Sequence, residues 1–277
     1  MKRFGQARRM VTVYQGGEQR RHGDWLAEEA PVELRYHGEP FAVMMVTPTD
    51  LEDFARGFSL SEGLVARAVD IRGVAVQELL EGYVVDVDSV TAVGREPGSE
   101  RLLPGRSGCG LCGTRRLEDA VRQFPPVPPG PRLAAAAVPR ALAELTRRQP
   151  LNVATGAMHA AAWASRTGIV RRVREDVGRH NALDKLLGAL GRDGTDFQDG
   201  FVLVTSRASY EMVSKCIAHG VGLLAAISAP TALAVELARA GNLTLIGFAR
   251  PGRHVVYSHP QRLEAATPER DGNGTGR

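Results

Sequence analysis

The sequence predicts an α/β protein in two parts, a small β-rich N-terminal domain and a C-terminal α/β/α three-layer sandwich. In the first hundred residues, apolar-rich segments are separated by turn residues, as in antiparallel strands. After a proline-rich stretch, short apolar segments alternate with amphipathic segments long enough for helices, as in a largely parallel sheet. We therefore expect the β-rich domain at 10–93, a mobile loop with a short helix and a Pro-rich linker at 94–131, the α/β domain at 132–262 and a disordered tail at 263–277.

In the N-terminal part, the segment 32–46 predicts a β-hairpin, because its two apolar-rich halves are separated by the turn sequence His-Gly-Glu-Pro. Thr49 is followed three residues later by Glu52, which is the pattern of a capping box at the start of a helix. Residues 82–88, Gly-Tyr-Val-Val-Asp-Val-Asp, predict a further strand. One helix among strands is therefore expected here.

The Pro-rich stretch at 125–131 ends the short helix expected at 114–124, because proline lacks an amide hydrogen and clashes inside a helix. The segments that follow alternate in character as far as residue 249. We expect helices within 133–148, 180–190, 208–220 and 230–241, and strands within 168–177, 201–206, 221–228 and 242–249.

The composition is that of a globular protein with nearly balanced charge. Of the 277 residues 43% are hydrophobic, and 35 basic residues against 31 acidic ones leave a net charge of +4. No apolar run approaches the roughly 20 residues that span a bilayer, and the basic start lacks the apolar stretch of a signal peptide. We therefore expect a cytoplasmic protein without membrane association, and the dispersed charge does not predict nucleic-acid binding.

The sequence Cys-Gly-Leu-Cys-Gly at 109–113 is the strongest chemical signal in the chain. Cys109 and Cys112 precede the short expected helix, whose N-terminal dipole would stabilise a thiolate. Arg106, Arg115 and Arg116 add positive charge nearby, and the interspersed glycines let the backbone bend. This pattern favours a reactive thiol pair on a mobile loop, able to hold and pass on a persulfide.

Three other interpretations of this motif remain open. A thioredoxin-like enzyme would place Cys-x-x-Cys directly after a buried strand, whereas here a loop rich in arginine and glycine precedes it. A structural zinc site needs a second pair of ligands, and no second Cys-x-x-Cys, Cys-x-x-His or His-x-x-x-His is present. The motif could also be a turn with two incidental cysteines. The third cysteine, Cys216, is too distant to suggest a disulfide framework.

A zinc deaminase signature, His-x-Glu followed by Pro-Cys-x-x-Cys, is only partly matched. His37 and Glu39 have the right spacing, but they fall in the predicted hairpin turn rather than at the start of a helix. Gly108 stands where the signature has proline, and about 70 residues separate the two halves. We therefore reject deaminase chemistry and expect no zinc.

Polar and basic residues collect where predicted strands give way to helices or turns. Ligands of α/β sheets lie beyond the carboxyl ends of the strands, and helix N-termini bind phosphate. Three such loops on one sheet edge would form a pocket for a phosphorylated or nucleotide-like ligand. The residues are Asp176, Gly178, Arg179, His180 and Asn181; Ser206, Arg207, Ser209, Tyr210 and Glu211; and Arg250 with Arg253.

Structural roles compete with each of these functional ones. Asp176 and Asn181 are equally suited to capping a helix, and Arg250 and Arg253 to a solvated turn. His180 taken alone is more often structural than catalytic. Three further residues are expected in the core or at caps without chemistry: His159, His219 and Cys216, the last buried and inert in its helix.

Five separated motifs, in the same order, make the chain similar to the FdhD family from about residue 25 to 260. They are Thr-Pro-x-Asp with Gly-Phe-x-Leu-x-Glu-Gly near the N-terminus, Ser-Gly-Cys-Gly-Leu-Cys-Gly, Arg-Glu-Asp-Val-Gly-Arg-His-Asn-Ala-Leu-Asp-Lys, Thr-Ser-Arg-Ala-Ser-Tyr-Glu-Met-Val-Ser-Lys and Asn-Leu-Thr-Leu-Ile-Gly-Phe-Ala-Arg-Pro-Gly-Arg. Members are formate dehydrogenase accessory proteins that act as sulfur carriers.

The resemblance implies a sulfurtransferase that accepts persulfide sulfur from a cysteine desulfurase. It passes the sulfur to the molybdenum of a bis(molybdopterin guanine dinucleotide) cofactor, which formate dehydrogenase requires. The resemblance also implies a cytidine-deaminase-like C-terminal fold without zinc, and a homodimer. Cys109 would carry the persulfide with Cys112 as its partner, and the guanine dinucleotide cofactor would contact Phe248, Ala249, Arg250, Pro251, Gly252 and Arg253.

Two alternatives from other functional classes stay open. The first is a molybdenum-cofactor-binding chaperone whose cysteines are not catalytic, since the loops after residue 175 could bind the cofactor alone. The second is a thiol–disulfide oxidoreductase, which a disulfide-reduction assay would separate from both.

Overall fold

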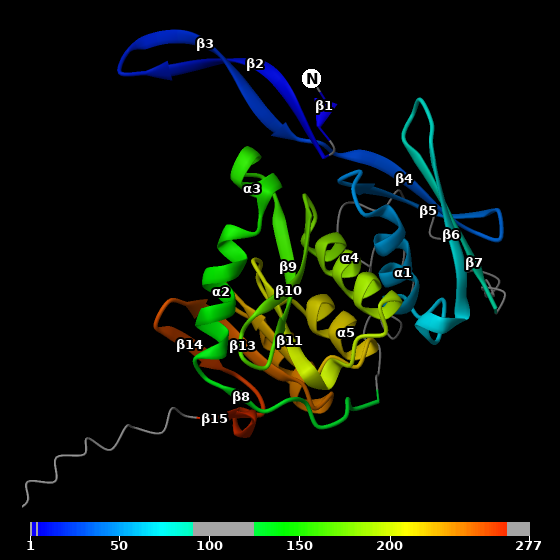
Figure 1. Cartoon of the computed structure of the whole chain (residues 1–277), viewed down its shortest axis with the longest axis vertical. Coiled ribbons are helices and arrows are strands. Elements are labelled where there is room, and N and C mark those ends of the chain that lie inside the picture. Colours follow the sequence, from blue (N-terminus) through cyan, green and yellow to red (C-terminus); the bar gives the residue numbers. More distant parts are fainter. Residues whose placement is uncertain (1, 4, 91–124, 265–277) are drawn as a thin grey trace, which may run out of the picture.

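The computed structural model describes residues 2–3, 5–90 and 125–264 and shows a mixed α/β protein built around two main sheets (Figure 1). A four-stranded sheet lies in the N-terminal part and a six-stranded sheet in the C-terminal part. In these described ranges, no helix combines the length and apolar character needed to cross a membrane.

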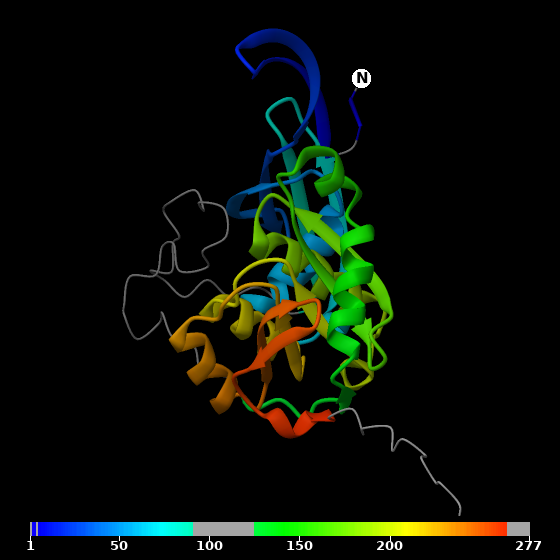
Figure 2. The same cartoon turned by 90° about the vertical axis from the view of Figure 1, so that its left-hand side faces the viewer.

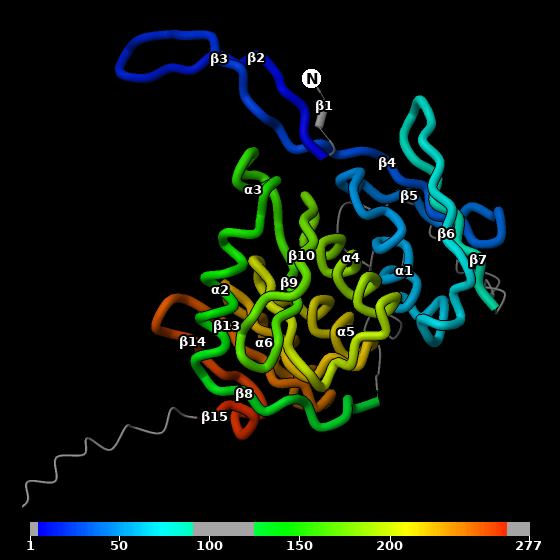
Figure 3. The backbone as a smooth tube through the Cα atoms, in the orientation of Figure 1, coloured from blue at the N-terminus to red at the C-terminus, as the bar shows by residue number. Residues whose placement is uncertain are grey.

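A long hairpin at the N-terminus projects from the body of the protein (Figure 3). Strands β2 (Gln6–Gln15) and β3 (Glu18–Ala27) pair antiparallel along their whole length, and the short β1 (Lys2–Arg3) adds to β2. Most side chains beyond the base of the hairpin are exposed. The sequence analysis missed this element, because its many arginines and glutamines hide the alternation that marks a strand.

The predicted hairpin at 32–46 and the strand at 82–88 are both confirmed, and they belong to one sheet of order β5-β4-β7-β6. In it β4 and β7 run parallel, and the other pairs are antiparallel. The strands are β4 (Ala30–Tyr36), β5 (Glu39–Val46), β6 (Ile71–Glu78) and β7 (Tyr83–Ser89), and the 3-10 helix η1 (Ala68–Asp70) precedes β6.

Helix α1 (Leu51–Ser61) packs Phe54 and Phe58 into the core of this sheet. The helix was predicted, but its capping box was wrong. Asp50 occupies the N-cap position in the left-handed region (φ 52°) and makes no side-chain cap. The Thr49 hydroxyl instead accepts a hydrogen bond from Lys185 of the C-terminal part (3.4 Å).

The six-stranded sheet has the order β10-β9-β11-β12-β13-β14. Two of its pairs are parallel, β11 with β12 and β12 with β13, and three are antiparallel. The expectation of a largely parallel sheet is therefore met in part: β10, β11, β12 and β13 run in one direction, whereas β9 and β14 run against their neighbours. The strands are β9 (His159–Ser165), β10 (Val170–Asp176), β11 (Gly200–Val204), β12 (Leu223–Ala226), β13 (Thr244–Arg250) and β14 (Arg253–Val256).

Helices cover both faces of this sheet, which gives three layers (Figure 2, with α2 in green and α6 in orange). Along β11, Phe201 and Leu203 face one core with α2, whereas Val202 and Val204 face the other core with α4, α5 and α6. The helices are α2 (Ala137–Arg147), α3 (Pro150–Thr155), α4 (Arg179–Arg192), α5 (Tyr210–Ala218) and α6 (Ala232–Ala240), with the 3-10 helix η3 (Phe197–Asp199) before β11.

The Pro-rich stretch at 125–131 is attached to the C-terminal part at Val127. This residue is buried, its amide donates to the carbonyl of Gly241 (3.0 Å), and its carbonyl accepts from Asn242 (2.9 Å). The first two residues of the expected tail form β15 (Leu263–Glu264), which follows the 3-10 helix η4 (Pro260–Arg262) and pairs with β8 (Leu133–Ala134). Residues 265–277 lie outside the described residues.

The two parts meet where α1 crosses α4. Gly57 faces the backbone of Asp184, and Gly188 faces the backbone of Asp53, so closely that a Cβ at either glycine would overlap the opposite helix. The N-terminal part is therefore held rigidly against the sheet that carries the candidate site.

Candidate functional site

Four connections meet at one edge of the six-stranded sheet. Strands β10, β11, β12 and β13 run in the same direction, so their carboxyl ends lie together. The loops that follow them lead into α4, α5, α6 and β14. The structure thus brings the three polar loops singled out in the sequence to a single edge, as expected for an α/β ligand site.

Backbone hydrogen bonds join neighbouring loops at this edge. The amide of Ser228 donates to the carbonyl of Ser206 (3.4 Å), and the amide of Ala208 donates to the carbonyl of Ala229 (3.3 Å). The amide of Phe248 then donates to the carbonyl of Ser228 (3.1 Å). The loop before α5, the loop before α6 and the turn after β13 therefore form one continuous surface.

Asp176 holds the loop before α4 in place and is fully buried. Its Oδ1 accepts hydrogen bonds from the amide of Gly178 (2.8 Å) and from Asn181 (3.0 Å). Its Oδ2 accepts from the amide of Thr47 (3.0 Å) and pairs with the ammonium of Lys185 (2.7 Å). Both oxygens of Asp176 are thus engaged within the protein. The helix-capping role considered for Asp176 and Asn181 is wrong, because Gly178 is the N-cap residue of α4 and no side chain caps it; the two side chains instead bond each other and hold the loop. The sequence analysis missed Lys185 and Thr47.

His180 and Glu211 connect the starts of α4 and α5. The Nε2 atom of His180 lies 2.7 Å from a carboxylate oxygen of Glu211, and both side chains are largely buried. Burial lowers the pKa of His180 and Glu211 opposes this, so the imidazole is neutral near pH 7. Burial, and after it the charges of Arg179 and His180, lower the pKa of half-buried His159.

The turn after β13 presents an exposed aromatic ring and two cations. Phe248 has φ 49° at an irregularity in the β13–β14 pairing, and its side chain is 39% exposed. A positive φ is strained for a bulky residue and is found mostly at functional sites. Arg250 and Arg253 are exposed and pair with no carboxylate among the described residues. Ala249 is buried in the core, so a ligand here would meet only its backbone.

Cys109 and Cys112 lie outside the described residues, as do the rest of the loop and the short helix expected at 114–124. Cys216 is described and is fully buried in α5. Burial, together with nearby Asp184, raises the pKa of its thiol well above the usual range. Its inert character is therefore as predicted.

A second buried polar cluster lies between α1, α4 and α5, and the sequence analysis missed it. Lys215 pairs with Asp184 (2.8 Å) and with Glu62 (3.7 Å), and the hydroxyl of Ser61 donates to Asp184 (2.8 Å). Burial raises the pKa of Asp184, opposed chiefly by Lys215. Each charge has an opposite partner, so the cluster ties the two parts of the protein together. The only sequence signal for this cluster was that charged residues occur on the otherwise apolar faces of α1, α4 and α5.

Comparison with known proteins identifies the family. The model of the FdhD/NarQ family matches residues 27–264. The chain belongs to the FdhD/NarQ family.

Two relatives cover almost the whole chain and are both named sulfur carrier protein FdhD. The one from Xanthomonas campestris pv. campestris (strain B100) is 52% identical over 266 residues, which is 95% of this chain and 94% of the relative. The one from Cupriavidus necator is 52% identical over 255 residues, 92% of this chain and 88% of the relative. A crystal structure of a protein described as a formate dehydrogenase accessory protein, from Desulfotalea psychrophila, matches with a TM-score of 0.77 at 24% identity. It covers 94% of this chain and 99% of that one, which supports the shared fold.

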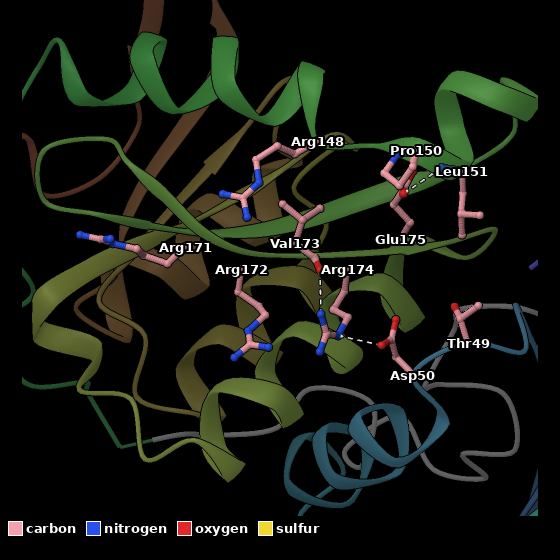
Figure 4. A pocket seen from close by; sticks show the side chains of 10 residues that line it. All are labelled: Thr49, Asp50, Arg148, Pro150, Leu151, Arg171, Arg172, Val173, Arg174 and Glu175. Atoms are coloured by element: carbon pink, nitrogen blue, oxygen red, sulfur yellow. Dashed lines mark hydrogen bonds and ion pairs between the residues drawn. The ribbon is translucent and has the colours of Figure 1, made fainter. Parts of the chain in front are cut away.

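This FdhD/NarQ family member also has a cavity of about 530 Å³ along the outer side of β10 (Figure 4). Three of the arginines that line it have carboxylate partners: Arg174 with Asp53 (2.6 Å), Arg172 with Asp193, and Arg148 with Glu144 (3.1 Å). Arg148 and Arg174 also donate to the carbonyls of Val170 and Val173. The arginines thus bond carbonyl groups at the free edge of β10 and place positive charge along it, and both features disfavour pairing with another strand.

In the described part of the chain, no group of three or more His, Cys, Asp or Glu residues is arranged to hold an ion. His37 and Glu39 flank Gly38 in the turn between β4 and β5, as predicted, and His37 bonds Ser89 there (3.1 Å). His37 therefore links the hairpin turn to β7.

Proposed function

We propose that this protein is a sulfur carrier and sulfurtransferase that accepts persulfide sulfur from a cysteine desulfurase. It transfers the sulfur to the molybdenum of bis(molybdopterin guanine dinucleotide), the substrate in this reaction, and so supports formate dehydrogenase activity. Membership of the FdhD/NarQ family and relatives named sulfur carrier protein support this proposal. It includes Cys109 as the persulfide residue and Cys112 as its partner.

The observation that carries the acceptor side of the proposal is the turn at Phe248–Arg253. An exposed aromatic ring offers a stacking surface for a purine base, and arginine forks match phosphate oxygens. Phe248 is held in this exposed position by its left-handed backbone and its bond to Ser228, at the carboxyl edge of the sheet. The turn therefore has the chemistry that a guanine dinucleotide requires.

Mass spectrometry tests the donor side. The protein is incubated with a cysteine desulfurase and cysteine, and the peptide that gains one sulfur atom is identified. We expect added sulfur on Cys109, its loss in Cys109→Ala, and normal loading in Cys216→Ala, because Cys216 is buried. Undiminished loading of Cys109→Ala, together with normal formate dehydrogenase activation in cells, would contradict the proposal.

A cofactor-binding chaperone is the second candidate, because the described sheet edge presents its aromatic ring and cations without using a cysteine. This candidate predicts that Cys109→Ala and Cys112→Ala still activate formate dehydrogenase, while Arg250→Ala and Arg253→Ala do not. The sulfur carrier predicts loss in both sets. Arg140→Ala, an exposed arginine on α2, is the matched control and should behave like the unaltered protein in either case.

The proposal extends to the surroundings of the reaction. It places the protein in the cytoplasm, where a cysteine desulfurase and the apo-dehydrogenase would be met, and it treats the protein as a homodimer. It also includes a cytidine-deaminase-like topology for residues 132–262, without zinc, as the family resemblance implies.

A further inference from the structure

The N-terminal hairpin carries the whole net charge of the chain. Residues 1–27 contain six basic and two acidic residues, and their net charge of +4 equals that of all 277 residues, so residues 28–277 are neutral overall. Strands β2 and β3 stand out from the body of the protein in both views (Figures 1 and 2). The excess positive charge is therefore concentrated on one projecting element.

The pairing of β2 with β3 separates the charges between its two faces. Side chains directly opposite each other in an antiparallel pair lie on the same face. Both acidic residues, Glu18 and Asp24, lie on one face, opposite Gln15 and Arg9. The other face has no carboxylate, and we call it the arginine–aromatic face. Its large side chains are Arg8, Met10, Tyr14, Arg21 and Trp25.

The arginine–aromatic face has the composition of a protein interface. Tyr, Trp, Met and Arg are enriched where proteins bind each other, whereas Asp and Glu are depleted there. Tyr14 is 74% exposed and Met10 is 60% exposed. The side chain of Arg8 lies across Gly23, where an added Cβ would be 2.7 Å from its Nε atom. Neither Arg8 nor Arg21 pairs with a carboxylate in the described part of the chain.

The hairpin gains little stability from its own contacts. A two-stranded hairpin with solvent on both faces is marginally stable in water, and β1 adds only two residues to it. A partner that covers the arginine–aromatic face would bury Met10 and Tyr14 and supply the apolar contacts that the hairpin lacks. Because the arginines would be covered as well, that partner must bring carboxylates to them.

The base of the hairpin lies against the loop that precedes α4. A Cβ added at Gly5 would be 3.2 Å from a methyl carbon of Thr47, and the amide of Thr47 donates to Asp176 at the end of β10 (3.0 Å). The hairpin thus starts at the carboxyl edge of the six-stranded sheet. Four strand spacings, about 19 Å, separate the ends of β10 and β13. A standard protein interface, about 800 Å² and thus about 28 Å across, spans that distance.

Other occupants fit this face less well. Tight DNA binding uses about 6–10 phosphate contacts, whereas the arginine–aromatic face offers two arginines beside apolar side chains. A second copy of the chain, paired face to face about a two-fold axis, would bring Arg8 and Arg21 against the same positive charges. An acidic protein surface with some apolar area matches both components of the face.

We propose that the arginine–aromatic face of the β2–β3 hairpin is a docking surface for an acidic surface of the apo-dehydrogenase. This inference rests on the proposed function, in which the dehydrogenase receives the cofactor after sulfur transfer. A dehydrogenase bound to the hairpin would lie over the carboxyl edge, beside the turn at Phe248–Arg253. The hairpin thus selects the recipient of the cofactor rather than the donor of the sulfur.

Two charge-reversal pairs in the full chain test the face against the charge alone. Arg8→Glu with Arg21→Glu alters the arginine–aromatic face, and Arg9→Glu with Arg20→Glu makes the same change in net charge on the opposite face. Binding to purified apo-formate dehydrogenase is measured by biolayer interferometry at low and high salt. We expect the first pair to weaken binding about 10-fold or more, chiefly at low salt, and the control pair to weaken it less than about 3-fold.

Tyr14→Ala tests the apolar component without a change of charge. It should weaken the same binding about 5-fold at both salt concentrations, as the loss of an interface anchor does. All three variants should keep the melting temperature of the unaltered protein, because the altered side chains are exposed. Loading of sulfur from the desulfurase should also be unchanged in each.

Four results would overturn the inference. Equal weakening by the two charge-reversal pairs would show that net charge, not this face, attracts the dehydrogenase. Reduced sulfur loading with normal dehydrogenase binding would assign the hairpin to the donor. Loss of self-association in sedimentation, or of binding to duplex DNA, in the first pair alone would assign the face to a second copy or to nucleic acid. Absence of any complex between the unaltered protein and the apo-dehydrogenase at micromolar concentration is the fourth. The proposed function fails separately, through normal sulfur loading and activation by Cys109→Ala.

Discussion

Replacing Asp176 with asparagine should destabilise the protein by about 3–5 kcal/mol, because the change leaves a buried ammonium without a counter-charge. Asp176 and Lys185 are both completely buried and lie 2.7 Å apart. The remaining partners of Lys185 are the carbonyl of Thr47 (2.9 Å) and two contacts at 3.4 Å, which do not replace a charge. The asparagine NH2 group would also face one of the donors that the carboxylate now accepts.

The reverse substitution should cost less. In Lys185→Met the carboxylate of Asp176 keeps its bonds from Thr47, Gly178 and Asn181, so it stays solvated by protein donors. The loss is then close to one charged hydrogen bond, about 1.5–3 kcal/mol. The double variant should be more stable than the sum of the two losses predicts, because the uncompensated ammonium is gone.

Urea unfolding followed by the fluorescence of Trp163, a buried residue of β9, measures all four forms of this double-mutant cycle. A loss of under about 1 kcal/mol for Asp176→Asn would refute the reasoning, since a buried unpaired charge cannot be so cheap. So would additive losses in the double variant. Either result would mean that water or another charge stabilises the Lys185 ammonium, although the side chain is completely buried.

Three further predictions concern stability and reactivity. Burial lowers the pKa of His219 to about 4, so the contribution of the neutral imidazole to folding stability is complete above pH 6.5 and is lost as the pH falls towards 4. In His219→Gln, the free energy of unfolding measured in urea should therefore vary less with pH over that range, by up to about 3 kcal/mol. Gly57→Ala should destabilise the protein by about 1–3 kcal/mol or more, because its Cβ overlaps the backbone of α4. Gly191→Ala is the control and should be tolerated, because its Cβ would lie 3.3 Å from a methyl group. Equal melting temperatures for the two variants would contradict this prediction. Cys216 should resist thiol reagents until the protein is unfolded, and native labelling of a variant lacking both cysteines of the Cys-x-x-Cys motif would disprove its burial.

The sequence was most informative where side-chain periodicity and turn residues agree. The hairpin at 32–46 and the helix starting at Arg179 have both, and both are confirmed. Strand β9 has neither, because its residues His159–Ser165 are mostly alanine, which predicts helix. It is a central strand buried on both faces, where small side chains let helices pack closely, and only the tertiary structure decides this.

The sequence predicted where the candidate site lies, but not which of its side chains pair with one another. The sequence located the loops at the carboxyl edge, since strand and helix alternation alone implies that edge. It did not reveal that Asp176 is occupied by Lys185 or that His180 faces Glu211, because both pairs form between residues whose separation in sequence carries no such information. The structure thus moves Asp176 from the candidate ligand residues to the scaffold.

The attachment of the chain at Val90 and Val127 has a kinetic consequence. The amide of Val90 donates to Asp70 (2.8 Å) and that of Val127 to Gly241 (3.0 Å), so the intervening segment is tied to the protein at both ends. Cys109 is about 18 residues from each attachment, and a fully extended chain of that length reaches at most about 60 Å, whatever its conformation. The sulfur that we propose on Cys109 would, within that radius, have an effective concentration of about a millimolar towards an acceptor on the same chain. Transfer within one molecule would then proceed at a rate independent of how dilute the protein is.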